Sequence, residues 1–199
     1  MKFAITGGIA TGKTLVADML REQGLLLLDA DSLALDYISS SEELRGRISE
    51  EFGSESFSPE GRINRGWLAS RVFADDSSLA RYNAIYQPAW LKYLQNTLDA
   101  AEQQGTIGLD AALVAEWEIA PWFDIIILIT TAPELRSARL QQSRGLSAEE
   151  ARRRIDTQLD DRARRQIATE VICNDRSVED LRREVKRLVR LITGASTRI

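Results

Sequence analysis

The segment Gly7-Gly-Ile-Ala-Thr-Gly12-Lys13-Thr14 matches the pattern G-x-x-x-x-G-K-[ST] in full. It follows the apolar run Phe3-Ala4-Ile5, which predicts a buried strand, and it precedes a helical pattern from Lys13 to Gln23. Glycines allow backbone conformations in which consecutive N–H groups point at an anion, and the following helix presents its positive dipole end. A strand, this loop and a helix together predict a phosphate-binding loop (P-loop).

Each position of the loop has an expected task in binding a nucleotide. Lys13 supplies positive charge to the β- and γ-phosphates, and the Thr14 hydroxyl is suited to bind Mg²⁺. The residues expected to contact ATP along the loop and the first helical turn are Gly8, Ile9, Ala10, Thr11, Gly12, Lys13, Thr14 and Leu15. The N-K-x-D guanine motif and the apolar run ending in D-E of ATP-driven motors are missing from the sequence, which favours a small-molecule kinase.

Four further apolar runs predict four more strands, at 25–28, 106–109, 124–130 and 171–173. Continuous apolar strands that alternate with helices predict an α/β fold with a five-stranded parallel sheet flanked by helices. Two apolar faces predict two of the flanking helices. The first helix stops at Gly24, and its apolar face comprises Leu15, Val16, Met19 and Leu20. The second covers residues 178–192, and its apolar face comprises Leu181, Val185, Leu188 and Ile192.

Two stretches are too long to be simple crossovers, and we expect them to be insertions in one domain spanning residues 1–199. Residues from about 32 to 105 predict an inserted helical substrate subdomain, and residues from about 135 to 167 predict a helical lid. In the lid, Arg139 to Gly145 suggests an exposed turn. An S-x-x-E capping box then begins a helix with a shared face: Ser147, Glu150, Ala151, Ile155, Leu159 and Ala163.

The amino-acid composition excludes several kinds of catalytic and metal-binding site. The chain has no histidine, which excludes Ser-His-Asp and Cys-His catalysis and histidine-bound zinc. Its one cysteine, Cys173, cannot form an internal disulfide or a four-thiolate metal site. A metal would therefore have mainly oxygen ligands, which favours Mg²⁺.

Charge and hydropathy set the expected partners and location. The net charge is −4, but residues 135–190 contain 15 Arg and Lys against 10 Asp and Glu. Most of these arginines are expected on solvated helix surfaces, and the interleaved acids argue against nucleic-acid binding. No apolar run approaches the roughly 20 residues of a membrane span, and the first residues lack the pattern of a signal peptide. We therefore expect a cytoplasmic protein without a membrane partner.

Several motifs in order resemble the dephospho-CoA kinase family. The opening I-T-G-G-I-A-T-G-K-T is similar to that family's L-T-G-G-I-x-S-G-K-S, and Asp29-Ala30-Asp31 matches its D-A-D. Residues 109–116 resemble its D-x-P-L-L-x-E, residues 152–158 its R-I-x-x-Q and residues 168–174 its A-D-x-V-I-x-N. The resemblance covers residues 3 to about 185. The departures are Gln87-Pro88 for H-P, Ala112 for a proline, Thr169 for an aspartate, and Arg144 one position later than the lid's R-x-x-x-R spacing from Arg139.

This resemblance implies transfer of the ATP γ-phosphoryl group to the ribose 3′-hydroxyl of dephospho-CoA, with ATP and Mg²⁺ as cofactors. The roles it implies are Asp31 as the group that accepts or orients the hydroxyl proton, Arg139 and Arg144 on the phosphates, Asn174 on adenine, Asp110 with Thr14 on the metal, and Gln87, Leu113 and Glu116 on the acceptor. Asp29 and Asp31 could divide two roles, one as a helix cap and one as the catalytic residue, with Asp31 the catalytic one. Asp110 could instead be a cap, Glu116 a solvated helix acid, and Asn174 a residue that turns the chain after the last strand. Trp67, Tyr86 and Trp90 could line the acceptor site, but such aromatic residues more often form the core of a small subdomain.

Two other functions stay open from the sequence. One is another P-loop kinase acting on a nucleoside, a nucleotide or a small alcohol. The other is a nucleotide-gated binding protein without transfer activity, which Gln87 and the shifted Arg144 make conceivable. The protein is expected to be a monomer or a weak homo-oligomer.

Overall fold

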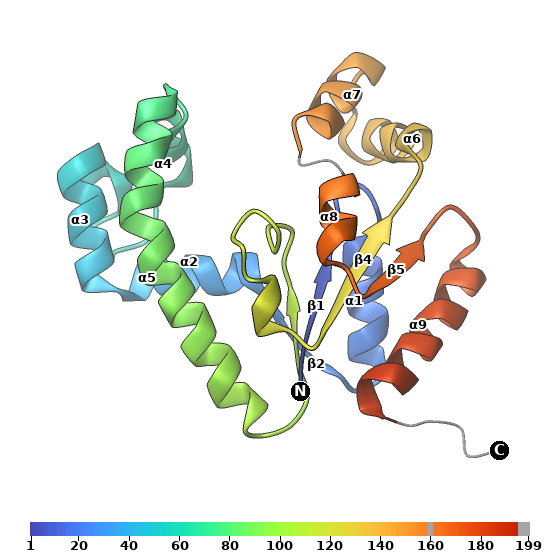
Figure 1. Ribbon diagram of the computed structural model, residues 1–199. Coiled ribbons are helices and arrows are strands. Elements are labelled where there is room, and N and C mark those ends of the chain that lie inside the picture. Colours follow the sequence, from blue (N-terminus) through green and yellow to red (C-terminus); the bar gives the residue numbers. More distant parts are fainter. Residues whose placement is uncertain (159–160, 195–199) are drawn as a thin grey trace. The chain divides into compact units, whose positions relative to one another are not determined.

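The computed structural model describes residues 1–158 and 161–194 (Figure 1). Its strands are β1 (Lys2–Thr6), β2 (Leu26–Asp29), β3 (Ile107–Asp110), β4 (Ile125–Thr130) and β5 (Glu170–Cys173). Its helices are α1 (Lys13–Glu22), α2 (Ala30–Ser40), α3 (Glu42–Phe52), α4 (Arg65–Val72), α5 (Asp76–Glu102), α6 (Pro133–Arg144), α7 (Ala148–Asp156), α8 (Asp161–Ile167) and α9 (Val178–Thr193). Short 3₁₀ helices cover Ser54–Ser56 and Ala120–Trp122.

The five strands form one parallel sheet in the order β2-β3-β1-β4-β5, which confirms the predicted sheet. β1 is the central strand, so the loop that follows it leaves the carboxyl edge of the sheet near its middle. At that edge Asp110 is the Cα partner of both Ile5 on β1 and Asp29 on β2. Two carboxylates therefore end neighbouring strands beside the P-loop.

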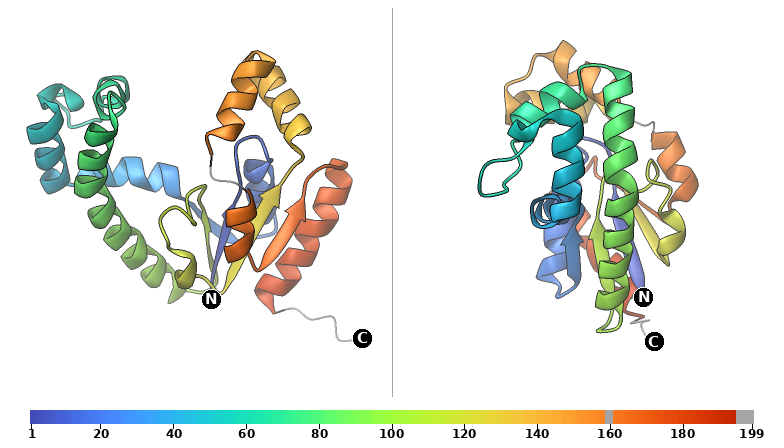
Figure 2. Two further views of the ribbon diagram at one scale, coloured as in Figure 1. Left: turned by 45° about the horizontal axis from the view of Figure 1, so that its top comes forward. Right: turned by 90° about the vertical axis from the view of Figure 1, so that its left-hand side faces the viewer.

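Helices α1 and α9 pack together on one face of the sheet, and α8 contacts β4 on the other face (Figures 1 and 2). The predicted face of α9 is buried in the main core, as are Val16, Met19 and Leu20 of α1. Leu15 was expected on the same face, but it is 39% exposed because it lies at the edge of the apolar stripe. Gly24 has φ +83° and ends the segment as predicted.

Residues 30–100 form a second compact unit, whereas the first unit comprises residues 1–29 and 101–199. The second unit is helical and has its own apolar core, which includes Ile38, Leu44, Ile48, Phe52 and Leu68. Its α5 continues through Pro88. In this unit, whose residues are all described, the only β-pairing outside the named strands is a bridge between Phe57 and Ile63.

Two expectations about residues 135–167 are wrong. The stretch from Arg139 to Arg144 is the second half of α6 rather than a turn, and the helix ends at Gly145 with φ +64°. The helix expected from Ser147 onward is two helices, α7 and α8, although the capping box of Ser147 and Glu150 is present. Leu159, expected on the shared face, lies outside the described residues.

Among residues 1–158 and 161–194, no helix is both long enough and apolar enough to cross a membrane.

Candidate active site

The P-loop joins β1 to α1 and has two residues in left-handed backbone conformations. Gly12 has φ +91°, and a Cβ at this position would collide with the side-chain nitrogen of Asn174, so only glycine fits. Ala10 has φ +61° despite carrying a Cβ, a conformation that persists only when the surroundings hold it. α1 begins at Lys13, so the positive end of its dipole faces the loop. The loop therefore has the conformation expected of an anion site.

Lys13 and Asp110 form an ion pair at the carboxyl edge of the sheet. Burial raises the pKa of the Asp110 carboxyl, Lys13 opposes that rise, and the negative charge of nearby Asp29 adds to it. The loop thus holds its ammonium group next to a buried carboxylate, at the position where phosphates are expected.

Three side chains hold the carbonyl groups of the loop on one side. Arg139 donates from Nη1 to the carbonyl oxygens of Ala10 at 3.2 Å and Thr11 at 3.3 Å. Asn174 donates from Nδ2 to the Thr11 carbonyl oxygen at 2.8 Å, and Thr131 donates from Oγ1 to the same oxygen at 3.0 Å. Arg139 also donates to the Asn174 carbonyl oxygen at 2.9 Å. These bonds bring two predicted residues, Arg139 and Asn174, to the loop.

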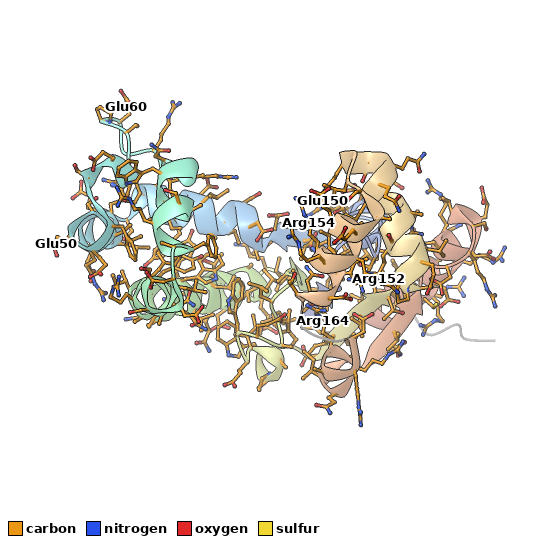
Figure 3. The ribbon with its side chains drawn as sticks, turned by 90° about the horizontal axis from the view of Figure 1, so that it is seen from above. Glu50, Glu60, Glu150, Arg152, Arg154 and Arg164 are labelled. Atoms are coloured by element: carbon orange, nitrogen blue, oxygen red, sulfur yellow. The ribbon has the colours of Figure 1, made fainter. Side chains whose placement is uncertain are left out.

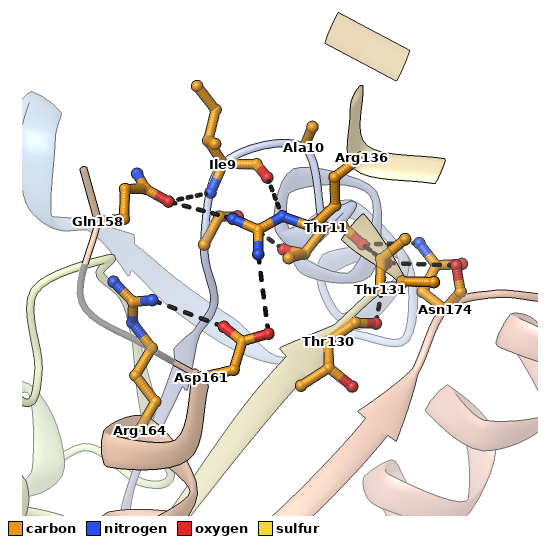
Figure 4. Close-up of polar contacts among 12 residues, drawn as sticks. Ile9, Ala10, Thr11, Thr130, Thr131, Arg136, Gln158, Asp161, Arg164 and Asn174 are labelled. Atoms are coloured by element: carbon orange, nitrogen blue, oxygen red, sulfur yellow. Dashed lines mark hydrogen bonds and ion pairs between the residues drawn. The ribbon is translucent and has the colours of Figure 1, made fainter. Parts of the chain in front are cut away.

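Two residues to which the sequence assigned no role contact Ile9 (Figure 4). Gln158 accepts from the Ile9 N–H at 2.7 Å through Oε1, and Arg136 donates from Nε to the Ile9 carbonyl oxygen at 2.9 Å. Arg136 is only 5% exposed, and burial is the main reason that its pKa is lowered. Its Nη1 lies 3.8 Å from Asp161 Oδ2, which is the first residue of α8.

A buried arginine extends this group of charges to the segment after β3. Arg164 is 2% exposed and pairs with Asp161 at 3.6 Å and with Glu116 at 3.0 Å. Glu116, expected to touch the acceptor, thus has a role in holding Arg164. Most other arginines of residues 135–190 are on the surface as expected, including Arg152 and Arg154 of α7 (Figure 3).

The remaining predicted residues of the sheet-containing unit lie at the surface. Thr14 is exposed in the first turn of α1. Leu113 is 40% exposed in the turns after β3. Arg144 is exposed in the last turn of α6, whereas Arg139, one and a half turns earlier, is half-buried. Arg139 therefore contacts the loop, whereas Arg144 lies at the C-terminal end of α6.

Asp31 and Gln87 belong to the second unit. Asp31 is exposed in the first turn of α2, and Gln87 is half-buried in α5. Burial raises the pKa of Tyr86, and the negative charge of Asp31 contributes to that rise, so the two side chains lie near each other. Asp31 therefore borders a stacked aromatic cluster.

That aromatic cluster is part of the core of the second unit. Tyr86 stacks on Trp90 with ring centroids 6.1 Å apart and on Tyr82 at 5.4 Å. Trp90 is completely buried, whereas Trp67 lies outside the stack, with the Arg71 guanidinium 4.6 Å from its ring. The core role that the sequence favoured fits Trp90 best.

Signals for the missed residues were present in part. Gln158 ends the stretch 152–158, and Arg136 precedes Arg139 by one helical turn, which places both arginines on one face of a helix. That face could not be recognised while 139–144 was expected to be a turn.

Comparisons with known proteins agree with this geometry. A family model described as dephospho-CoA kinase matches residues 1–180. A dephospho-CoA kinase of Corynebacterium glutamicum is 32% identical over 191 residues, covering 95% of this chain and 96% of that protein. The crystal structure of TT1252 from Thermus thermophilus superposes with a TM-score of 0.77 at 31% identity, covering 96% of this chain and 97% of that one. A dephospho-CoA kinase from Campylobacter jejuni has the same fold, with a TM-score of 0.76 at 24% identity, covering 98% of this chain and 100% of that chain.

Proposed function

The chain belongs to the dephospho-CoA kinase family, and on that premise we propose that it transfers the γ-phosphoryl group of ATP to the ribose 3′-hydroxyl of dephospho-CoA, the last step of coenzyme A synthesis. The observation that carries the proposal is the P-loop of residues 7–14, with Lys13 paired to Asp110, in a chain that matches the family over residues 1–180.

Positioning and electrostatics supply the catalysis in this reaction. Phosphoryl transfer passes through a loose, in-line transition state, so the protein mainly orients the groups and stabilises negative charge. The N–H groups of the loop and of the first turn of α1, from Gly8 to Leu15, bind the phosphates, except the Ile9 N–H, which donates to Gln158. Lys13 leaves the Asp110 carboxylate and pairs with phosphate oxygens. Arg139 adds a second positive charge beside the loop, whose carbonyl groups it binds. Arg144 provides a further, exposed cation at the end of α6.

Asp31 is the proposed group that orients the acceptor hydroxyl and takes its proton. It is exposed and lies at the start of a helix that directly follows β2, so ligand can reach it. Gln87, Leu113 and Glu116 are the proposed acceptor contacts. Asn174 lies beside the loop, where its side chain donates to the Thr11 carbonyl oxygen, and it is the proposed contact to adenine.

The residues present fit a Mg²⁺ ion. Thr14 and Asp110 offer a hydroxyl and a carboxylate at the carboxyl edge of the sheet, with the charge of Asp29 close by. The described residues contain no group of three or more His, Cys, Asp or Glu that would enclose a metal. This agrees with Mg²⁺, which is usually bound by one or two protein oxygens, water and substrate phosphates. When bound there, the ion would neutralise charge on the phosphates.

A transfer assay with a panel of acceptors tests the proposal. The protein with ATP and Mg²⁺ is incubated with dephospho-CoA, adenosine, a nucleoside monophosphate or shikimate, and the products are identified by mass and by the position of the new phosphate. We expect transfer to the 3′-hydroxyl of dephospho-CoA only. Preferred transfer to another acceptor would favour a different P-loop kinase, and ATP binding without any transfer would favour a nucleotide-gated binding protein.

A further inference from the structure

The Ile9 residue of the P-loop is held at both of its backbone polar groups by side chains from the C-terminal half of the chain. Its N–H donates to Gln158 Oε1 at 2.7 Å, and its carbonyl accepts from Arg136 Nε at 2.9 Å. Arg136 Nη2 also donates to the same Gln158 oxygen at 3.3 Å, which closes a ring of three hydrogen bonds (Figure 4). We call Arg136 and Gln158 the Ile9 clamp.

The clamp determines which way the next peptide group points. A trans peptide is planar, with its C=O and N–H directed to opposite sides. Holding the Ile9 carbonyl against Arg136 therefore directs the N–H of Ala10 away from the Arg136 side chain of α6. That N–H belongs to the loop segment whose donors face the phosphates.

Ala10 itself needs such support. Its φ of +61° is a left-handed conformation, which is unfavourable for a residue with a Cβ. Hydrogen bonds on both sides of Ala10 stabilise this conformation. Arg136 donates to the carbonyl of the preceding residue, Ile9, and Arg139 donates to the carbonyl of Ala10 itself at 3.2 Å.

The close packing of the clamp also explains a glycine that the P-loop pattern leaves free. Gly8 occupies an x position of G-x-x-x-x-G-K-[ST]. A Cβ there would lie 2.5 Å from Arg136 Nη2 and 3.0 Å from Gln158 Oε1, so a larger residue would displace both side chains.

The clamp is connected to the segment after β3. Asp161 lies between Arg136 and Arg164, and Arg164 pairs with Glu116 at 3.0 Å. Arg136 is more than nine-tenths buried, and a buried charge is costly unless a counter-charge lies near it. The Asp161 carboxylate, 3.8 Å from the guanidinium, supplies that counter-charge.

We propose that Arg136 and Gln158 are positioning residues for phosphoryl transfer, which hold the Ile9 backbone so that the Ala10 N–H faces the phosphates of ATP. This inference rests on the proposed kinase function and goes beyond it, because neither residue contacts the reacting atoms in its role. The clamp sets the affinity and alignment of the nucleotide and leaves acceptor binding unchanged.

The first test compares two substitutions of Gln158 in the full-length protein. Gln158→Met keeps the length of the side chain and removes the acceptor, and Gln158→Glu keeps an acceptor oxygen for both Ile9 and Arg136. Gln142→Met, at an exposed position of α6, is the matched control. For each protein, kcat/KM for ATP, the KM for dephospho-CoA, the dissociation constant of Mg-ADP and the melting temperature are measured.

The Ile9 N–H is part-buried against Gln158, and a shielded donor left without a partner has a typical cost that corresponds to about ten- to a hundredfold. We expect Gln158→Met to lower kcat/KM for ATP by about that factor, with KM for dephospho-CoA within about twofold of wild type. Gln158→Glu should recover most of the loss, and Gln142→Met should behave as wild type. A Gln158→Met protein with unchanged kcat/KM and unchanged Mg-ADP affinity would overturn the clamp. So would a loss that follows the melting temperature and is not recovered by Gln158→Glu.

A double substitution tests whether the two side chains act together. Arg136→Lys removes the Nε donor and keeps the charge. Because both residues hold the same peptide, Arg136→Lys with Gln158→Met should lose little more than the worse single variant, whereas independent effects would multiply. Multiplying losses would overturn the clamp. If the wild-type protein binds Mg-ADP but phosphorylates no dephospho-CoA, the proposed function fails, and the Mg-ADP affinities of the variants still decide the clamp.

Discussion

Lys13 and Asp110 form an ion pair whose carboxylate is the more deeply buried partner: the Asp110 side chain is 5% exposed and that of Lys13 is 20% exposed. The pKa of Asp110 is raised chiefly by burial, so Lys13 only partly offsets the cost of placing this charge inside the protein. In the structure Lys13 is the counter-charge of this carboxylate. In the proposed function Lys13 would instead contact the phosphates, and the carboxylate would help to hold Mg²⁺.

Lys13→Ala should therefore lower both activity and stability. Loss of a preorganised charge in the transition state costs on the order of a hundredfold in rate or more. The buried Asp110 carboxylate loses its counter-ion, so the melting temperature at pH 7 should also fall. The double variant with Asp110→Asn should recover melting temperature without recovering transfer. Near-normal transfer by Lys13→Ala would contradict the assignment of the P-loop, and an unchanged melting temperature would contradict the role of the pair.

Asp31→Asn should reduce transfer to dephospho-CoA by about a hundredfold, because it keeps the size of the side chain but cannot take a proton. ATP affinity should stay the same. Asp29→Asn serves as the comparison: it ends β2 opposite Asp110, so it removes a neighbouring negative charge and should change rate less. Transfer rate, ATP affinity and melting temperature are measured for both. Normal turnover by Asp31→Asn with a large loss in Asp29→Asn would assign catalysis to the other carboxylate.

Arg139→Ala should lower transfer strongly and also lower the melting temperature, because the guanidinium holds two P-loop carbonyls and the carbonyl of Asn174. An arginine in an exposed turn of the lid, which the sequence predicts at this position, would change only the rate. Arg144→Ala, at the exposed end of α6, should leave melting unchanged and reduce transfer less. Calorimetry and steady-state kinetics separate the two variants, and equal, negligible effects would remove both arginines from the site.

The tyrosine cluster of the second unit predicts an alkaline loss of stability. Burial raises the pKa of Tyr82 from 10.0 to about 12. In the unfolded chain Tyr82 loses its proton first, so the free energy of unfolding should fall as pH rises from 10 to 12. Tyr82→Phe retains the ring that stacks on Tyr86 and should weaken that fall. Denaturant unfolding at pH 8 and pH 11 measures the difference, and equal pH dependence in both proteins would contradict the prediction.

The sequence predicts the sheet well because its signals are local. The run Ile125 to Ile129 has few alternatives to a buried strand, and residues 7–14 identify both the loop and the helix after it. Gly24 and the Ser147–Glu150 capping box mark helix boundaries through contacts that span only a few residues.

The clamp could not be predicted in the same way, because it depends on contacts between distant residues. Arg136 is one of many arginines in a basic stretch, and only the folded structure shows that it is buried and reaches Ile9, 127 positions earlier. Asn174 had an expected role with adenine, yet its amide holds the Thr11 carbonyl. Composition alone cannot distinguish an arginine that binds phosphate from one that binds backbone.

The strand order has a consequence for synthesis of the chain. β1 is made first and occupies the centre of the sheet, but its partners β3 and β4 begin at residues 107 and 125. The first strand must therefore remain without its neighbours while about a hundred residues leave the ribosome. During that time residues 30–100, which are helical and have their own apolar core, can fold. The P-loop forms only after β3 and β4 pair with β1, so nucleotide binding should be among the last properties to arise as the chain is made.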